Sequence, residues 1–203
     1  MKKKVIENHK SYLERTELFK SFGYDPEKER DFIIDKALPF SEKILEVGSG
    51  KGHFALALAK RGYDLTSVDI SEEEQEIASL NLQYFGMEKQ IVFKIENAEE
   101  LSFPDSSYDT VFSINTVHHL ISPLKAVDEM IRVVSLYGKI ILSDFTKEGF
   151  DIVDKINLQE GKKHEVGNIG LSEIGVYMRE KGFKVEKYED EYQEILVAYR
   201  QII

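Results

Sequence analysis

Apolar and polar residues follow two patterns along the chain, one typical of strands and the other typical of helices. Short apolar runs, which predict buried strands, occur at residues 43–47, 64–70, 91–95, 108–114 and 138–145. Between these runs, helices are expected to begin at Ser71 and Ser122. The second of these helices has apolar residues at helical spacing, namely Leu124, Val127, Ile131 and Val134. This alternation is typical of a mostly parallel sheet with helices on both faces.

The last third of the chain follows a different pattern. A helix is expected near residues 150–159, within the mixed and polar stretch 149–170, and a further helix is expected to begin at Ser172. Two strand-like runs at residues 183–189 and 192–200 are close enough to pair as an antiparallel hairpin at the sheet edge. We therefore expect an α/β fold with seven strands, mostly parallel, with an antiparallel strand near the C-terminus.

The strongest chemical signal lies at residues 44–53, Ile-Leu-Glu-Val-Gly-Ser-Gly-Lys-Gly-His, where a predicted strand enters a glycine-rich turn that opens a helix. Glycine lets the backbone approach a ligand closely and adopt turn angles that side chains resist. Asp69 ends the next predicted strand, where a carboxylate can accept hydrogen bonds from both hydroxyls of a ribose. Together these residues predict a nucleotide-binding site.

Three kinds of nucleotide site share this outline, and the glycine spacing separates them. A phosphate-binding P-loop needs Ser or Thr after Gly-Lys, but Gly52 follows Lys51, and Leu45 stands where the first glycine belongs. A dinucleotide fingerprint, G-x-G-x-x-G, would need a glycine in place of His53. The glycines instead follow the pattern Glu-x-Gly-x-Gly-x-Gly, at Glu46, Gly48, Gly50 and Gly52.

This pattern resembles the first motif of the class I S-adenosylmethionine-dependent methyltransferases, and the resemblance continues from Ile44 to Phe145. Residues 96–104 resemble the family's segment beside the adenine, residues 107–112 its Phe-Asp-x-Val strand, and residues 115–120 the loop that follows. The motifs look like the branch that contains ubiquinone- and menaquinone-biosynthesis methyltransferases. The resemblance implies a Rossmann-like fold and S-adenosylmethionine as the cofactor, with S-adenosylhomocysteine as the product.

The resemblance also implies the residues of the cofactor site. Asp69 matches the family's acidic residue that holds the ribose. Asn97 stands where the family has an Asp beside the adenine, and it keeps a carbonyl acceptor while losing the charge. Glu46 is expected to fix the turn, or to reach the cofactor only through backbone or water. The expected cofactor-binding residues are Glu46, Val47, Gly48, Ser49, Gly50, Gly52, Asp69, Ile70, Asn97, Ala98 and Asn115.

The sequence gives fewer signals for the residues that contact the acceptor. Methyl transfer from a sulfonium requires alignment and exclusion of water, and a base only when the acceptor must lose a proton. His118 and His119 follow the fourth predicted strand, and His118 is the candidate catalytic base. Because adjacent side chains usually point apart, at most one of them is expected to face the site, and packing against the next helix is the alternative for either. His164 either reaches the same opening or lies on the surface.

Ahead of the core, residues 41–203, the pattern predicts two N-terminal helices at residues 10–19 and 27–36. This segment, residues 1–40, is expected to cap the cofactor and acceptor site within a single domain. Its aromatic side chains either form a lid over the pocket or anchor the helices to the core, and the sequence leaves both roles open; they are Tyr12, Phe19, Phe22 and Tyr24.

Charge and composition narrow the choice of partner. The formal net charge of −10 argues against nucleic acid, because a duplex-binding protein needs a cationic face. The Asn/Asp-Pro-Pro-Tyr motif that is common in enzymes of the fold that methylate amide or base nitrogens is replaced by Asn115-Thr116-Val117-His118, so we expect a small-molecule acceptor. The resemblance to the ubiquinone and menaquinone branch implies methylation on carbon or oxygen. The chain has no cysteine, which excludes a thiolate nucleophile. No His/Asp/Glu spacing predicts a metal site.

Location and rival functions complete the sequence-based hypothesis. The chain shows neither a secretory apolar run nor an apolar stretch near the roughly 18 residues of a membrane span, so we expect a cytoplasmic protein. The sequence leaves the acceptor and the oligomeric state open. One rival function is an NAD(P)-dependent oxidoreductase, against which His53 argues because it replaces the third glycine. The other is a non-catalytic S-adenosylmethionine-binding sensor or scaffold, which no residue excludes.

Overall fold

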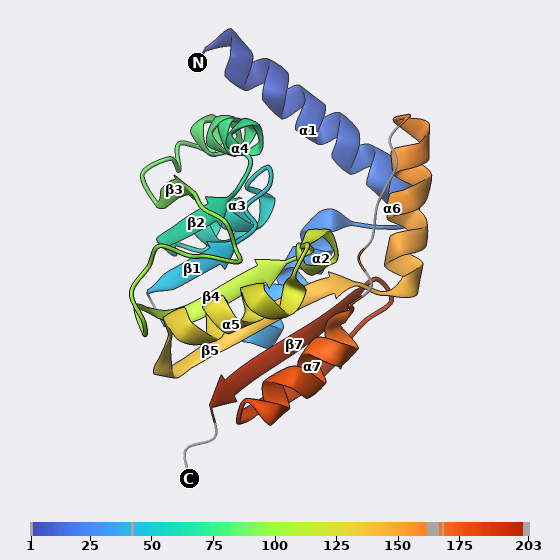
Figure 1. The fold of residues 1–203 in the computed structure, drawn as a ribbon. Helices are drawn as coiled ribbons and strands as arrows, with labels where there is room; N and C mark the ends of the chain where they lie inside the picture. The colour runs from blue at the N-terminus through green and yellow to red at the C-terminus, as the bar shows by residue number, and fades with distance from the viewer. Residues whose placement is uncertain (1, 42, 162–166, 168, 201–203) are drawn as a thin grey trace.

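The computed structural model describes residues 2–41, 43–161, 167 and 169–200. At its centre is a seven-stranded sheet in the order β3-β2-β1-β4-β5-β7-β6 (Figure 1). The strands are β1 (Ile44–Val47), β2 (Leu65–Asp69), β3 (Ile91–Ile95), β4 (Tyr108–Ile114), β5 (Val134–Phe145), β6 (Phe183–Glu189) and β7 (Gln193–Arg200).

Strands β1 to β5 pair in parallel, whereas β7 lies between β5 and β6 and runs antiparallel to both. The predicted seven-stranded sheet with an antiparallel C-terminal strand is therefore confirmed. All four residues of β1 are buried. A parallel strand covered by helices on both sides needs apolar side chains in both directions, which explains why the central strands are continuous apolar runs.

Helices cover both faces of the sheet and form two apolar cores. One face carries α2 (Pro26–Ala37), α3 (His53–Lys60) and α4 (Glu72–Phe85), and the other carries α5 (Pro123–Val133) and α7 (Leu171–Glu180). In Figure 1, α5 and α7 lie in front of the sheet. Val111 and Phe112 of β4 belong to different cores, because successive side chains of a strand point to opposite faces.

Two further helices, α1 (Lys3–Ser21) and α6 (Lys147–Gln159), stand apart from the sheet faces. Figure 1 shows α1 running from α4 to α6. At the α6 end, Tyr24, Ile152 and Ile156 form a small third core with aromatic residues of the segment after α1 and of the β5 and β7 ends. The Arg15–Glu160 ion pair joins the same two helices.

The other end of α1 packs on α4. Asn8 Nδ2 donates to Asn81 Oδ1 at 2.7 Å, and the His9 ring stacks on Tyr84 with 3.4 Å between centroids. Asn81 Nδ2 in turn donates to the carbonyl oxygen of Lys51 at 2.8 Å. The N-terminal helix is therefore linked, through one side chain of α4, to the glycine-rich turn after β1.

Several element boundaries differ from the prediction, among them the starts of α1, β5, α6 and α7. Helix α1 begins at Lys3 instead of residue 10, because contacts with α4 and α6 stabilise polar turns that lack a clear apolar stripe. Val134 belongs to β5 instead of the preceding helix, since it pairs with Tyr108 of β4. Helix α7 begins at Leu171, one residue before Ser172. In the described part of the chain, no helix is both long and apolar enough to cross a membrane.

Candidate functional site

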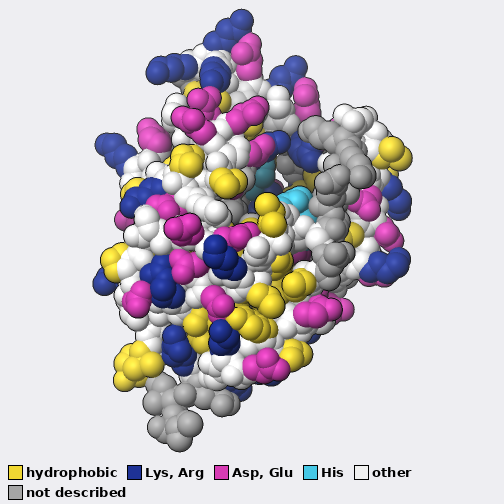
Figure 2. Space-filling model, viewed as in Figure 1, with side chains coloured by type: hydrophobic (Ala, Val, Ile, Leu, Met, Phe, Trp, Pro, Cys, Tyr) yellow, Lys and Arg dark blue, Asp and Glu magenta, His cyan; other side chains and the backbone are white. Residues whose placement is uncertain are grey.

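A cavity of about 1400 Å³ opens at the carboxyl ends of β1, β2 and β4, beneath α1 and α6. The order of the sheet reverses between β1 and β4, and crevices at such reversals are the usual ligand sites of open α/β sheets. Figure 2 shows the hollow, with histidine side chains inside it. A pocket for one small ligand measures about 300–1,000 Å³, so this cavity has room for a cofactor and an acceptor.

The glycine-rich turn that follows β1 forms the floor of the cavity. Gly48 and Gly50 have φ of 88° and 45°, in the left-handed region that favours glycine. A Cβ on Gly48 would lie 2.2 Å from Thr116 Oγ1, whereas a Cβ on Gly50 would meet nothing within 4 Å. The backbone N–H groups of Gly48 and Ser49 donate to the carbonyl oxygen of Val68 in β2, at 2.8 and 2.9 Å. The turn is thus held in place before any ligand arrives.

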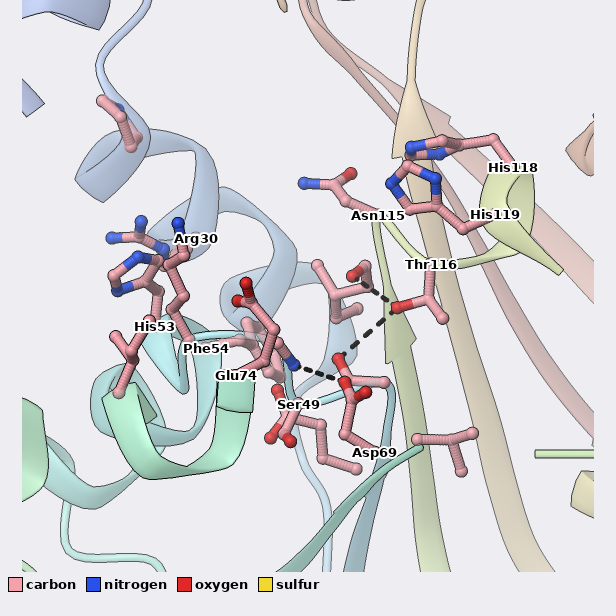
Figure 3. A pocket seen from close by; sticks show the side chains of 18 of the residues that line it. Arg30, Ser49, His53, Phe54, Asp69, Glu74, Asn115, Thr116, His118 and His119 are labelled. Atoms are coloured by element: carbon pink, nitrogen blue, oxygen red, sulfur yellow. Dashed lines mark hydrogen bonds between the residues drawn. The ribbon is translucent and has the colours of Figure 1, made fainter. Parts of the chain in front are cut away.

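Asp69, at the end of β2, ties the turn to the start of α4. Its Oδ2 accepts the backbone N–H of Gly50 at 2.7 Å (Figure 3). Its Oδ1 accepts the backbone N–H of Ser71 at 2.9 Å. A carboxylate has about four acceptor positions, so both oxygens can still accept a bond from a ribose hydroxyl. Ile70 follows and is 71% exposed at the cavity rim.

Glu46 lies buried beneath the turn, with 1% of its surface exposed. Ser67 Oγ of β2 donates to Glu46 Oε2. Burial, reinforced by the nearby charge of Asp69, raises the pKa of Glu46 to about 8 although the Ser67 hydrogen bond works in the opposite direction. Glu46 therefore carries a proton at neutral pH. Its hydrogen bond with Ser67 links β1 to β2 beneath the glycine-rich turn.

Replacing Glu46 with Gln is expected to change how stability depends on pH. The pKa of Glu46 rises from an ordinary 4.5 to about 8 on folding, so the folded state holds the proton more tightly. The free energy of unfolding should consequently fall between about pH 4.5 and pH 8, by up to about 1.4 kcal/mol per pH unit. Glu46→Gln removes this slope. Urea unfolding across that range measures it, with Glu88→Gln on the exposed surface as the control; an unchanged slope in Glu46→Gln would contradict the raised pKa.

The loop after β3 supplies Asn97 and Ala98, which are expected beside the adenine from the sequence, to the wall of the cavity. Asn97 Oδ1 accepts the backbone N–H of Glu99 at 2.9 Å, and Glu99 Oε1 accepts that of Ser122 at 2.8 Å. These bonds shape the loop beside the cavity.

All the expected cofactor residues line the cavity except Gly52. Gly52 instead packs against α4, where a Cβ on Gly52 would lie 2.7 Å from the Ala78 Cβ.

Asn115 follows β4 in a strained backbone conformation with φ of 51°. Its backbone N–H donates to the carbonyl oxygen of Ser143 at 2.8 Å, and its side-chain Oδ1 is buried without a hydrogen-bond partner. Non-glycine residues with positive φ persist where the surrounding structure requires them, and they cluster at functional sites. Figure 3 shows the Asn115 side chain within the cavity, beside His118 and His119.

His118 and His119 both line the cavity, and their ring centroids lie 3.9 Å apart. The expectation that at most one would face the site was wrong. It assumed an extended chain, whereas residues Val117–His119 form a turn of 3-10 helix, in which neighbouring side chains diverge less. His118 is 4% exposed, and its Nδ1 lies 2.6 Å from Asp144 Oδ1 at the end of β5. The motifs gave no signal for Asp144.

A cationic corner near the start of α3 was also missed by the sequence analysis. Arg15, Arg30 and Lys51 line the cavity around His53, and Figure 3 shows Arg30 beside His53. Burial, with these three positive charges, holds the pKa of His53 well below its usual value, so its ring is neutral. The corner adjoins the glycine-rich turn. Because Arg15 already pairs with Glu160, Arg30 and Lys51 are the cations that can receive an anionic group such as the carboxylate of an amino acid.

Two further expectations concern metals and His164. Among the residues that the structure describes, no group of three or more His, Asp or Glu side chains could hold a metal ion. His164 lies outside the described residues.

Comparison with known proteins decides between the kinds of nucleotide site. A family model described as "Methyltransferase domain" matches residues 45–142, from β1 into β5. The chain belongs to the class I S-adenosylmethionine-dependent methyltransferases. S-adenosylmethionine is therefore the cofactor that family membership implies. The glycine-rich turn, Asp69 and the cationic corner fit its amino-acid end and its ribose.

Curated relatives of this methyltransferase chain cover several activities. A 27-O-demethylrifamycin SV methyltransferase from Amycolatopsis mediterranei is 28% identical, over 73% of this chain and 56% of that protein. An S-adenosyl-L-methionine-dependent Diels-Alderase, iccD, from Talaromyces variabilis is 34% identical, over 66% of this chain and 47% of that protein. A ubiquinone/menaquinone biosynthesis C-methyltransferase, UbiE, from Rickettsia bellii is 29% identical, over 79% of this chain and 76% of that protein. The branch that the motifs predicted is therefore represented among the relatives.

The chain spans about half the length of the first curated relatives it matches, from 40% to 56%. Among solved structures, the PH0226 protein from Pyrococcus horikoshii superposes with a TM-score of 0.71 at 19% identity, covering 94% of this chain and 92% of that one. At this identity the superposition shows the fold alone, and it agrees with the predicted Rossmann-like α/β architecture.

Proposed function

We propose that this protein transfers a methyl group from S-adenosylmethionine to a small-molecule acceptor. One observation carries the proposal. The cavity holds a glycine-rich turn tied to Asp69 on the β1–β2 side and a buried His118–Asp144 pair on the β4–β5 side. The first is suited to a nucleoside and the second to proton transfer, and both belong to one cavity large enough for two ligands.

In this proposal each part of the cavity has its own task. The Gly48–Gly52 turn lies against the amino-acid end of the cofactor, with Arg30 within reach of its carboxylate. Asp69 accepts hydrogen bonds from the ribose, and Asn97 and Ala98 lie beside the adenine. The sulfonium of the cofactor supplies an activated methyl group with a good leaving group. What remains for the chain is to align the acceptor, exclude water and accept a proton at His118.

The acceptor in this proposal is a small molecule instead of a nucleic acid. The net charge of −10 disfavours a polyanionic substrate, and the cavity is roofed by α1 and α6. The rifamycin methyltransferase and UbiE relatives carry names that point to small molecules. A small molecule also suits a cavity with a mixed aromatic and polar lining.

Methyl transfer can be tested directly with trideuteromethyl S-adenosylmethionine and a panel of small hydroxylated, carbon-acidic, amine and thiol acceptors. Mass spectrometry should show a deuterated methyl group on an acceptor together with S-adenosylhomocysteine. Binding of the cofactor without transfer to any acceptor would instead favour a non-methylating role. The Diels-Alderase relative makes this second outcome worth an explicit search, because its name couples S-adenosylmethionine to another reaction.

The proposal extends to residues 1–40 as a cap on the site. Helix α1 lines the cavity through Tyr12, Arg15 and Phe19, while its contacts with α4 and α6 hold it in place. Tyr24 is 4% exposed and its hydroxyl accepts a bond from Gln193 Nε2 at 3.1 Å. The aromatic residues of this segment thus support both roles left open by the sequence: Tyr24 anchors the segment to the core, and α1 covers the opening.

Deletion of residues 2–22 should raise the acceptor KM by about tenfold or more and weaken S-adenosylhomocysteine binding less, because it uncovers the cavity but leaves Arg30, Lys51 and the glycine-rich turn in place. Steady-state kinetics and calorimetry measure the two effects. A shorter deletion, of residues 2–6, leaves the Asn8–Asn81 bond in place and serves as the control. Equal losses of both affinities, with a collapsed melting temperature, would show that α1 is an anchor only.

A further inference from the structure

Asp144 is a buried carboxylate at the end of β5, 4% exposed. Its Oδ1 lies 2.6 Å from His118 Nδ1, and its Oδ2 accepts the backbone N–H of His118 at 3.2 Å. The backbone N–H of Phe145 donates to the same Oδ1 at 2.9 Å. One carboxylate therefore holds His118 by its ring and by its backbone at once.

This contact decides which ring nitrogen of His118 carries the hydrogen. A carboxylate only accepts hydrogen bonds, so Nδ1 is the donor in the contact with Asp144. The lone pair of the neutral ring then lies on Nε2, which can take a proton from another molecule. A buried carboxylate in this position also stabilises the imidazolium that results. Because His118 lines the cavity, the pair provides a base on the acceptor side.

Acceptor classes differ in how much their methylation gains from a base at this position. A neutral amine has a lone pair ready for attack and can lose its proton after transfer. A thiol, with an ordinary pKa of about 8.5, ionises readily near neutral pH. A phenolic hydroxyl, with an ordinary pKa of about 10, stays protonated and gains most from a positioned base.

Aromatic rings continue from His118 along the cavity wall. The Phe145 centroid lies 5.9 Å from that of His118, the Tyr24 centroid 6.2 Å from that of Phe145, and the Phe19 centroid 5.3 Å from that of Tyr24. Phe19, Tyr24 and Phe145 all line the cavity. Rings at these separations pack well against a further planar ring, so the wall beside the base suits an aromatic ligand.

From this geometry we infer that the acceptor is an aromatic hydroxyl compound, with His118 as its base and Asp144 as the residue that positions His118. The inference rests on the proposed methyl transfer. The acceptor oxygen forms a bond to the methyl carbon as its proton passes to His118 Nε2. The C–S bond breaks and its electron pair stays on sulfur, so the products are an aryl methyl ether, S-adenosylhomocysteine and protonated His118.

Three acceptors that share a ring system but differ in nucleophile test the acceptor class: 2-naphthol, 2-naphthylamine and 2-naphthalenethiol. With the full chain and S-adenosylmethionine, kcat/KM should be highest for the naphthol, by about tenfold or more. Preferred transfer to the amine or the thiol would leave methyl transfer standing and overturn the hydroxyl assignment. No transfer to any of the three would overturn the aromatic hydroxyl assignment, whereas methyl transfer itself would still be decided by the wider acceptor panel.

Asp144→Asn tests the positioning role. The amide can donate to Nδ1 and so favours the wrong tautomer, and kcat for the naphthol should fall about 100-fold or more while S-adenosylhomocysteine affinity is retained. For 4-nitrophenol, which is already ionised in mildly alkaline buffer, wild type and variant should react at similar rates because no base is needed. Asp151→Asn, the same charge change at an exposed position of α6, is the control.

Equal losses of kcat on 2-naphthol and 4-nitrophenol in Asp144→Asn would mean that Asp144 has only a structural role.

A second measurement does not depend on the folding of the variant. In ¹⁵N spectra of the wild-type protein, the uncharged form of the His118 ring should carry its hydrogen on Nδ1. A hydrogen on Nε2 would overturn the assignment of His118 as a base held by Asp144.

Discussion

Asp69→Ala is expected to weaken the binding of S-adenosylhomocysteine by about 10- to 150-fold, which corresponds to the loss of about 1.5–3 kcal/mol from hydrogen bonds to a charged group. Both oxygens of Asp69 lie at the cavity, and each accepts only one backbone N–H, from Gly50 and from Ser71. The remaining acceptor positions can receive the ribose hydroxyls. Calorimetric titration of the folded variant measures the change directly.

Asp69 also steadies the glycine-rich turn, so its ribose contact must be separated from its effect on the backbone. The 2′,3′-dideoxy analogue of S-adenosylhomocysteine lacks both hydroxyls and should bind wild type and Asp69→Ala with nearly equal affinity, completing a double-mutant cycle. Asp64→Ala makes the same charge change at an exposed position just before β2 and should leave both affinities unchanged. A folded Asp69→Ala variant with unaltered affinity for S-adenosylhomocysteine would remove Asp69 from the site.

Gly48→Ala should abolish measurable cofactor binding and lower the stability of the protein by about 2–4 kcal/mol, the combined scale of left-handed strain and forced repacking. With φ of 88°, a Cβ on Gly48 would lie 2.2 Å from Thr116 Oγ1 and 2.4 Å from its Cγ2. Relief requires the turn to separate from the end of β4. The loop that carries Thr116 also carries Asn115 and His118, so both sides of the cavity would move.

Two other glycines separate the causes of this loss. Gly62 has the same φ of 88°, but a Cβ there meets nothing within 4 Å, so Gly62→Ala measures the strain alone. Gly50, with φ of 45°, also faces open space, so Gly50→Ala should fold while its methyl group intrudes on the cofactor. If Gly48→Ala had the same free energy of unfolding as Gly62→Ala and bound the cofactor normally, the close contact between the turn and Thr116 would not be needed for stability or binding.

The cofactor side of the site could be predicted because its geometry depends on short sequence intervals. Strand, glycine-rich turn and helix follow one another at β1 and α3, and backbone angles there follow from the residue types. Asp69 ends the next strand, and parallel neighbours place their carboxyl ends along one edge of the sheet. Spacing therefore sufficed to bring these residues together.

The acceptor side depends on contacts that spacing does not reveal. Asp144 meets His118 from 26 residues away, because β5 pairs with β4 and their ends adjoin. Arg30 reaches the cavity from a helix whose place beside α3 is set by core packing. Val134 continued the helical spacing of α5, yet pairing with β4 made it the first residue of β5. In each case tertiary contacts outweighed a local pattern.

Calorimetric titration with S-adenosylhomocysteine, with NAD⁺ and NADP⁺ as parallel ligands, tests the central claim most directly. We expect the homocysteine compound to bind with a dissociation constant on the order of micromolar, and neither dinucleotide to bind measurably. That result would establish the cofactor, and the acceptor would be the next question. Binding of a nicotinamide dinucleotide without S-adenosylhomocysteine would contradict the account, because the glycine-rich turn would then serve an oxidoreductase.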